Sequence, residues 1–323
     1  MPEPTVPSPR IPIVPAVFFG MVLGLGGLGS AWRVAARLWG LPTSIGEALS
    51  LTAAAIWCAW LALFAAKWIG ARQTARREAA DPVMSFSIGL IAMATLLVSV
   101  ALKPYAPSLA WWIFAIGLVA GLAFAVWLMG SAWQGARTVA ATTPLMYLTP
   151  VGAGYLGAIG AGGFGHIELA TMLWGTGAIA WLFIESAVLQ RLMTEPMPVP
   201  LRATVGIQLA PPAVGCMSYL AFTDGPPDRL AQFLFGYALL QGLILLRLTP
   251  WLRQQQFGPG AWAYTFGVAA LAVSSLVMLE RGNTVLMSRL APLLFAAANL
   301  LIGWIAARTL LLALNGKLFP PPP

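Results

Sequence analysis

Charged residues are scarce in this chain of 323 amino acids: they make up 9% of it, whereas 59% of the residues are hydrophobic. Soluble domains carry charge on roughly a quarter of their residues, so this chain lacks the polar side chains that a water-exposed surface requires. The same scarcity excludes a disordered chain. Cysteine is nearly absent, with only Cys58 and Cys216, which excludes a disulfide-rich secreted scaffold. Together with a mean hydropathy of +0.81, these absences indicate a membrane protein.

Catalytic and metal-binding residues are also few. The one histidine is His166, close to Glu168 in a predicted outer loop. A haem with two histidine ligands is therefore excluded on this chain alone, and a His/Cys metal site or a serine–histidine–aspartate triad has little support. The stretch 24–29 matches G-x-G-x-x-G but lies inside an apolar run, where a dinucleotide motif does not occur. We expect no enzyme activity, no cofactor and no metal site.

Long apolar runs occupy most of the sequence. A bilayer-spanning helix needs about 20 apolar residues, and each run is apolar on every face, which excludes the alternating strands of a membrane barrel. We therefore predict ten transmembrane helices in a single transmembrane domain, residues 1–323, with short tails at 1–14 and at the Pro-rich 315–323. The ten runs are 15–39, 44–69, 82–102, 108–132, 144–160, 166–189, 202–222, 228–248, 260–279 and 284–314.

The net charge of +8 and the isoelectric point near 10.1 do not indicate nucleic-acid binding. Basic residues sit singly at the ends of the runs, and the only cluster is Lys67, Arg72, Arg76 and Arg77. Such positions set membrane topology. Twelve of the 18 lysines and arginines fall on the side of the N-terminus, so the positive-inside rule predicts that both termini are cytoplasmic.

The runs alternate in composition. Odd-numbered runs are rich in small residues and contain prolines, whereas even-numbered runs carry many tryptophans. Small residues allow close helix packing or leave open space, and tryptophans suit contact with lipid. The pattern suggests five helical hairpins in a ring, with the odd helices around a central pore. Pro150 and Pro211 lie in the body of their runs, so we expect kinks there.

Glu185 is the one acidic residue deep inside a run. A charge at the bilayer centre is costly, by roughly 2.5–3.5 kcal/mol on insertion scales. We expect a structural ion pair with an arginine, either Arg202 or Arg247. The alternative is a role in proton coupling. The interiors of the odd runs are otherwise nearly free of ionisable groups, so a pore between them favours anions in the positive field of the protein and binds them weakly.

Several stretches resemble the tellurite-resistance/dicarboxylate transporter family, which includes plant slow-type anion channels. The similarity is strongest in the second half of the chain, and it covers residues 19–25, 177–189, 202–211, 236–251 and 262–267. The resemblance implies ten helices around a quasi-five-fold axis, a homotrimer with one pore per protomer, and a phenylalanine plug at Phe266. The resemblance implies that Pro150 and Pro211 correspond to prolines that kink helices in the family. At two further such positions of the family, this chain has Val22 and Ala92 in place of proline.

Helical spacing places Ala263, Ala270 and Val273 on the same face as Phe266. Because these residues are small and apolar, we expect the ring of Phe266 to be the main obstruction of the pore. We also expect that truncation of Phe266 leaves no cavity in a packed core and therefore costs little stability. Phe19, Gly24, Pro150 and Pro211 complete the predicted pore lining.

These observations predict an anion channel of the bacterial inner membrane that conducts small inorganic or organic anions passively and binds no nucleic acid. The alternative is a proton-coupled transporter or exporter of C4-dicarboxylate, sulfite or tellurite-like oxyanions.

Overall fold

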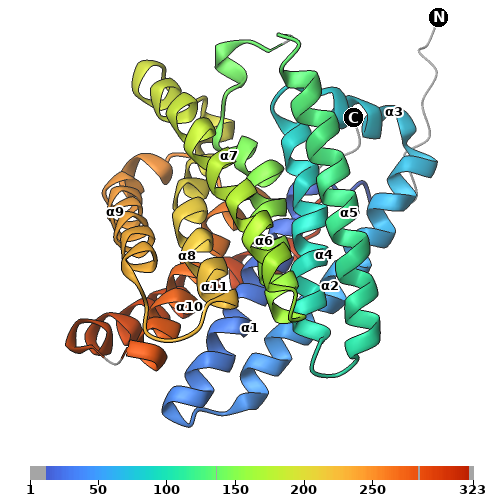
Figure 1. Cartoon of the computed structure of the whole chain (residues 1–323). Coiled ribbons are helices and arrows are strands. Elements are labelled where there is room, and N and C mark those ends of the chain that lie inside the picture. The colour runs from blue at the N-terminus through green and yellow to red at the C-terminus, as the bar shows by residue number, and fades with distance from the viewer. Residues whose placement is uncertain (1–11, 136, 283, 320–323) are drawn as a thin grey trace, which may run out of the picture.

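A computed structural model describes residues 12–135, 137–282 and 284–319. Within these residues every regular element is a helix, which confirms the predicted all-helical class (Figure 1). A helix satisfies its backbone hydrogen bonds within its own segment, and lipid offers no other partner for these groups.

Five long α-helices correspond to the even-numbered runs and continue without a change of helix type. Each has 24 or more residues, which is enough to cross the hydrocarbon core. They are α2 (Thr43–Gly70), α5 (Pro107–Ala132), α7 (Ile167–Thr194), α9 (Arg229–Leu252) and α11 (Val285–Leu314).

The odd-numbered runs all change helix type part-way. Each starts as a 3-10 helix and continues as an α-helix: η1 (Ala16–Phe19) into α1 (Gly20–Trp39), η2 (Met84–Ile88) into α4 (Gly89–Leu102), η4 (Pro144–Leu148) into α6 (Pro150–Gly163), η5 (Val199–Leu209) into α8 (Ala210–Phe222), and η6 (Pro259–Tyr264) into α10 (Thr265–Gly282). Two further short elements, α3 (Arg72–Ala80) and η3 (Val139–Ala141), lie between hairpins. Stretches of 3-10 helix within a longer helix often mark hinges.

Nine helical stretches in the described part of the chain are long and apolar enough to cross a membrane. They coincide with nine of the ten predicted runs. The exception is 144–160, which is divided at Thr149 into η4 and α6. Because α6 alone has 14 residues, a crossing here requires η4 and α6 together, and the count of ten spans stays a prediction.

Burial separates the two sets of helices. The membrane-length windows of the runs that contain α1, α4, α8 and α10 are 67% to 78% buried, whereas those of the five continuous helices are only 17% to 33% buried. The small-residue runs are therefore the buried set, and the tryptophan-rich runs carry most of the exposed apolar surface.

Each buried helix packs against the continuous helix that follows it, α1 against α2 and so on to α10 against α11. The buried helices also contact one another in chain order, α1 with α4, α4 with α6, α6 with α8 and α8 with α10, and α10 contacts α1. Figure 1 shows α9 on the left and α5 on the right of the view, with α8 and α6 between them.

Pro150 and Pro211 stand at changes of helix type rather than inside an α-helix, and the kinks expected there stay a prediction. Pro150 is the first residue of α6, and Pro211 is the second residue of α8. The amide groups of a first helical turn have no partner within the helix, so a proline costs little there. Both prolines instead stand where the 3-10 helix gives way to the α-helix.

The basic cluster near α3 is only partly exposed. Lys67 is buried at the end of α2, where it pairs with Glu78 of α3 and donates to the carbonyl oxygen of Val14 at 2.9 Å. Arg72, Arg76 and Arg77 are exposed on α3. The structure therefore uses the lysine to attach α3 and the N-terminal segment to α2.

Close contact between α6 and α7 depends on two glycines. A β-carbon placed on Gly154 lies 2.7 Å from the backbone nitrogen of Gly177, a separation that real β-carbons do not show. Gly175, in the same helix as Gly177, has no atom within 4 Å of such a carbon. The two helices can approach this closely only where both lack side chains.

We predict that Gly154→Ala destabilises the fold by about 1–3 kcal/mol, because the added methyl forces the two backbones apart. Thermal unfolding in mild detergent measures the effect. Gly175→Ala is the matched control and should leave the midpoint unchanged or raise it, since alanine favours the helix more than glycine does. Equal midpoints for the two variants would contradict the packing argument.

Candidate functional site

A small cavity lies among the buried helices. It has a volume of about 20 Å³, which is room for about one water molecule. Its lining comes from α4, η4, α6, η5, α8 and α10 and consists of Met93, Tyr147, Leu148, Val151, Gly152, Tyr155, Ile207, Ala210, Pro211, Val214 and Phe266. The cavity as it stands has no space for a hydrated ion.

The ring of Phe266 lies where the buried helices meet. Phe266 is the second residue of α10 and is 5% exposed. A β-carbon placed on Gly27 of α1 lies 3.3 Å from the ring, so the ring packs on α1 while it also lines the cavity. The ring therefore contacts α1 and borders a cavity whose other lining residues come in part from α4, α6 and α8.

The glycines of the G-x-G-x-x-G match serve helix packing. Gly24 faces Thr265 and Trp262, at the junction of η6 and α10, and Gly27 faces Ala269 as well as Phe266. The motif lies within α1 and follows η1 rather than a strand. This geometry agrees with the sequence argument against a dinucleotide site.

The cavity lining is uncharged, and its polar side chains are two tyrosines. Tyr155 is 1% exposed, with its ring between Gly177 and Gly215, and its hydroxyl has no hydrogen-bond partner among the described residues. Tyr147 donates its hydroxyl proton to Oε2 of Glu185 at 2.6 Å. Tyr147 therefore connects the cavity to the one buried carboxylate of α7.

Glu185 is held by neutral donors. Besides Tyr147 of η4, Trp181 Nε1 donates to Oε2 at 3.0 Å and Tyr237 donates to Oε1 at 2.9 Å. The amide nitrogen of Gln241 lies 3.5 Å from Oε1 and donates to the Tyr237 hydroxyl at 2.9 Å. The carboxylate is 8% exposed, and its hydrogen bonds join η4, α7 and α9. Hydrogen bonds to a charged acceptor are stronger than hydrogen bonds between two neutral groups.

No arginine pairs with Glu185 in the described residues, so the expected ion pair with Arg202 or Arg247 is wrong. The Arg202 guanidinium donates to Gln254 Oε1 at 2.7 Å and lies 4.7 Å from the ring centroid of Trp251. Arg247 is exposed on α9. Both guanidinium groups stay near the ends of helices, where they avoid the desolvation that a buried ion pair would cost.

Of the predicted pore-lining residues, Phe266 and Pro211 line the cavity. Phe19 is buried and packs edge-on against Phe64 of α2, with ring centroids 6.2 Å apart. Ala270 and Val273 are buried further along α10, and Ala263 is half-buried in η6. Their place along a conduction path stays a prediction, as does that of Gly24 and Pro150.

Sequence reasoning missed Met93, Tyr147, Tyr155 and Ile207 of η5. Tyrosines in otherwise apolar, glycine-rich runs are the signal that was available. Among the described residues no group of three or more His, Cys, Asp or Glu side chains converges as a metal site would require.

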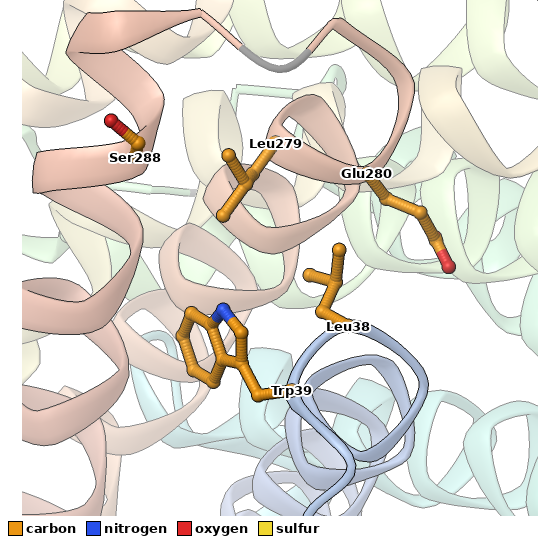
Figure 2. Close-up of a pocket in the computed structure, with 5 residues that line it drawn as sticks. All are labelled: Leu38, Trp39, Leu279, Glu280 and Ser288. Atoms are coloured by element: carbon orange, nitrogen blue, oxygen red, sulfur yellow. The ribbon is translucent and has the colours of Figure 1, made fainter.

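A second, larger pocket opens at the C-terminal end of α1. Its volume is about 400 Å³, and it is lined by Leu38 and Trp39 of α1, Leu279 and Glu280 of α10, and Ser288 of α11 (Figure 2). Glu280 already pairs with Arg37 at 3.0 Å. The one charged group of this pocket is therefore neutralised.

Comparison with known proteins places the chain in a family. Residues 14–310 match the family model described as voltage-dependent anion channel, SLAC1. The chain is 32% identical over 307 residues to the tellurite resistance protein TehA homolog of Haemophilus influenzae. This alignment covers 95% of this chain and 93% of that protein. The chain belongs to the SLAC1/TehA family, as its resemblance in sequence indicated. It is a multi-pass membrane protein of a family of anion channels and transporters.

We predict that Glu185→Gln lowers the free energy of unfolding by about 1.5–3 kcal/mol, because a neutral amide accepts these hydrogen bonds less strongly and places its NH2 group against other donors. Thermal unfolding in detergent measures this loss. Asp224→Asn, at an exposed loop position, is the control and should change the midpoint little. Equal stability of the two variants would show that the cluster does not support the fold.

Proposed function

We propose that this protein is a passive channel for small anions in the bacterial inner membrane and that Phe266 is its gate. The observation that carries this proposal is the position of the Phe266 ring. It is buried and lines an uncharged cavity among the buried helices that is too small for a hydrated ion.

The conduction path in this proposal runs between the odd-numbered helices. Five hairpins form one transmembrane unit with quasi-five-fold symmetry, and the buried helix of each hairpin faces the central axis. The contacts of α1, α4, α6, α8 and α10 with one another in chain order, together with the contact between α10 and α1, support a ring of this kind. Pro211, Ala263, Ala270 and Val273 then lie along the path with Phe19, Gly24 and Pro150.

Anion preference follows from charge. The lining of the cavity carries no ionisable group except two tyrosines, so no ring of carboxylates attracts cations. The net charge of +8 gives the protein a positive field that favours anions. Without a fixed cation in the lining, an anion binds weakly and leaves quickly, as conduction requires.

The gate works by steric and hydration effects. An apolar ring in an uncharged constriction fills the lumen and also excludes water from it, and an anion cannot cross without its hydration or a substitute for it. Displacement of one side chain then removes both barriers. The 3-10 segment that precedes Phe266 places the ring next to a change in helix type, where hinges often occur.

The alternative is a proton-coupled transporter or exporter of dicarboxylate, sulfite or tellurite-like oxyanions. One observation favours it: Tyr147 joins the cavity to the Glu185 carboxylate through a single hydrogen bond. The two functions differ in energetics. A channel passes anions down their own electrochemical gradient, whereas a coupled transporter also responds to the proton gradient. Flux into proteoliposomes, with and without a pH difference, distinguishes them.

In this proposal both termini are cytoplasmic and the protein assembles as a homotrimer with one pore per protomer. The exposed apolar side chains of α5 and α7, including Trp112, Trp127 and Phe183, offer surface for lipid and for neighbouring protomers. We predict a trimeric mass by light scattering, both in mild detergent and in nanodiscs. A monomeric mass in both environments would rule out the trimer.

We predict that Phe266→Ala raises anion conductance strongly in planar bilayers, because the ring that closes the cavity is removed. The structure changes the expected stability effect. Because the ring is 5% exposed and packs against α1, its loss should also destabilise the fold, by about 3–5 kcal/mol for a buried phenylalanine.

Stability therefore does not separate a gate from an ordinary core residue, and conductance does. Phe114→Ala is the matched control. Phe114 of α5 is 1% exposed, packs against Gly160 and lies outside the cavity lining. It should lose similar stability with no gain of current. Unchanged current in Phe266→Ala would exclude the ring as the gate.

A further inference from the structure

Gln208 is a buried polar side chain without a partner. It is 3% exposed, and neither its amide nitrogen nor its carbonyl oxygen makes a hydrogen bond to any of the described residues. An unsatisfied buried polar group loses the hydrogen bonds that it makes to water in the unfolded chain, so a carboxamide with both atoms unpaired destabilises the fold. Such a group calls for an explanation other than packing, since an apolar side chain of the same size avoids the cost.

Gln208 lies next to the cavity, although it is not itself one of the lining residues. It lies in the last turn of η5, and Ile207, Ala210 and Pro211 on either side of it all line the cavity. The Tyr147 hydroxyl is its polar neighbour. The Tyr147 hydroxyl gives its proton to Glu185, and the position of the Gln208 carboxamide relative to the hydroxyl oxygen does not meet the geometry of a hydrogen bond.

A carboxamide has complementary hydrogen-bonding groups. Its NH2 group donates to any anion, whereas its carbonyl oxygen needs a donor. A halide or nitrate ion has no proton to give, so it satisfies only the NH2 group. An oxyanion that retains an O–H group satisfies both ends of the amide.

We propose that Gln208 coordinates the permeating anion beside the Phe266 gate and selects for oxyanions that carry their own hydroxyl group. This inference rests on the proposed channel function and names the chemical class of its substrate. An anion that leaves the carbonyl oxygen of Gln208 unpaired makes one hydrogen bond fewer than an anion that donates to it. A site built around a substrate hydroxyl discriminates in this way against analogues that lack the group.

Hydrogen carbonate and nitrate are suitable probes. Both are planar, three-oxygen anions with a single charge, and only hydrogen carbonate has an O–H group. Reversal potentials under bi-ionic conditions in planar bilayers give their permeability ratio. We use the Phe266→Ala background, in which the current is expected to be large. With Gln208 present, hydrogen carbonate should be the more permeant ion.

The test variant is Gln208→Met, which keeps the length of the side chain and removes both polar atoms. We expect the permeability ratio of hydrogen carbonate to nitrate to fall by roughly three- to tenfold, which corresponds to one net hydrogen bond. Gln208→Asn retains the carboxamide on a shorter stem and should keep part of the preference. The melting temperature of Gln208→Met, on the wild-type Phe266 background, should stay unchanged or rise, since an unpaired amide is removed.

Asn299→Leu is the matched control. Asn299 of α11 is a partnered amide that accepts from Trp32 Nε1 at 2.8 Å and donates to the carbonyl oxygen of Phe295 at 2.8 Å. Its replacement should lower the melting temperature and leave the permeability ratio unchanged.

The possible failures are distinguishable. An unchanged ratio in Gln208→Met, with both ions still conducted, overturns the role of Gln208 and leaves the channel intact. A lower melting temperature with an unchanged ratio identifies Gln208 as an ordinary structural amide. Absence of current for both ions in the Phe266→Ala background overturns the channel proposal and this inference with it.

Discussion

The absence of hydrogen-bond partners in a lipid bilayer is the constraint on which this structure depends. Every peptide group in the hydrocarbon core must be satisfied within its own helix. Apolar side chains gain little by leaving lipid for protein, so the helices are held together by close packing rather than by a hydrophobic driving force. The buried helices meet this requirement with glycines. Gly154 and Gly177 bring α6 and α7 into backbone contact, and Gly24 and Gly27 bring α1 against η6 and α10.

The same constraint explains how much of the fold can be predicted from the sequence. The length and hydropathy of the runs locate the membrane-crossing helices, because lipid requires both. The contrast between glycine-rich and tryptophan-rich runs separates buried from exposed helices, because only small residues permit backbone contact. Helix type is not predictable in this way. The α-segments of α1, α4 and α10 start at Gly20, Gly89 and Thr265 without a proline at the junction, so proline alone does not specify the change from 3-10 to α.

The polar groups of the site were harder to predict, for a physical reason. A carboxylate in an apolar run leads one to expect a basic partner, because the pairing of opposite charges is a rule that needs only the sequence. The structure stabilises Glu185 with hydrogen bonds from η4, α7 and α9, and these donors converge only in the folded protein. Tyr147 is 38 residues from Glu185 in the chain. Gln208 raises the same difficulty, since a glutamine without a partner is recognisable only when all of its neighbours are known.

The packing around Phe266 also constrains how the cavity can open. In the proposed channel the ring must move before an ion can pass, and its contact with α1 at Gly27 leaves little room on that side. On the α4 side the cavity is lined by Met93, whose thioether packs against Gly152 of α6. Methionine is unbranched and has several rotatable bonds, so it can vacate space at lower cost than a branched or aromatic residue. For the gate that we propose, a rotation of the Phe266 ring toward α4, with Met93 displaced, would open the cavity with side-chain motion alone and would leave the glycine contacts between the backbones in place.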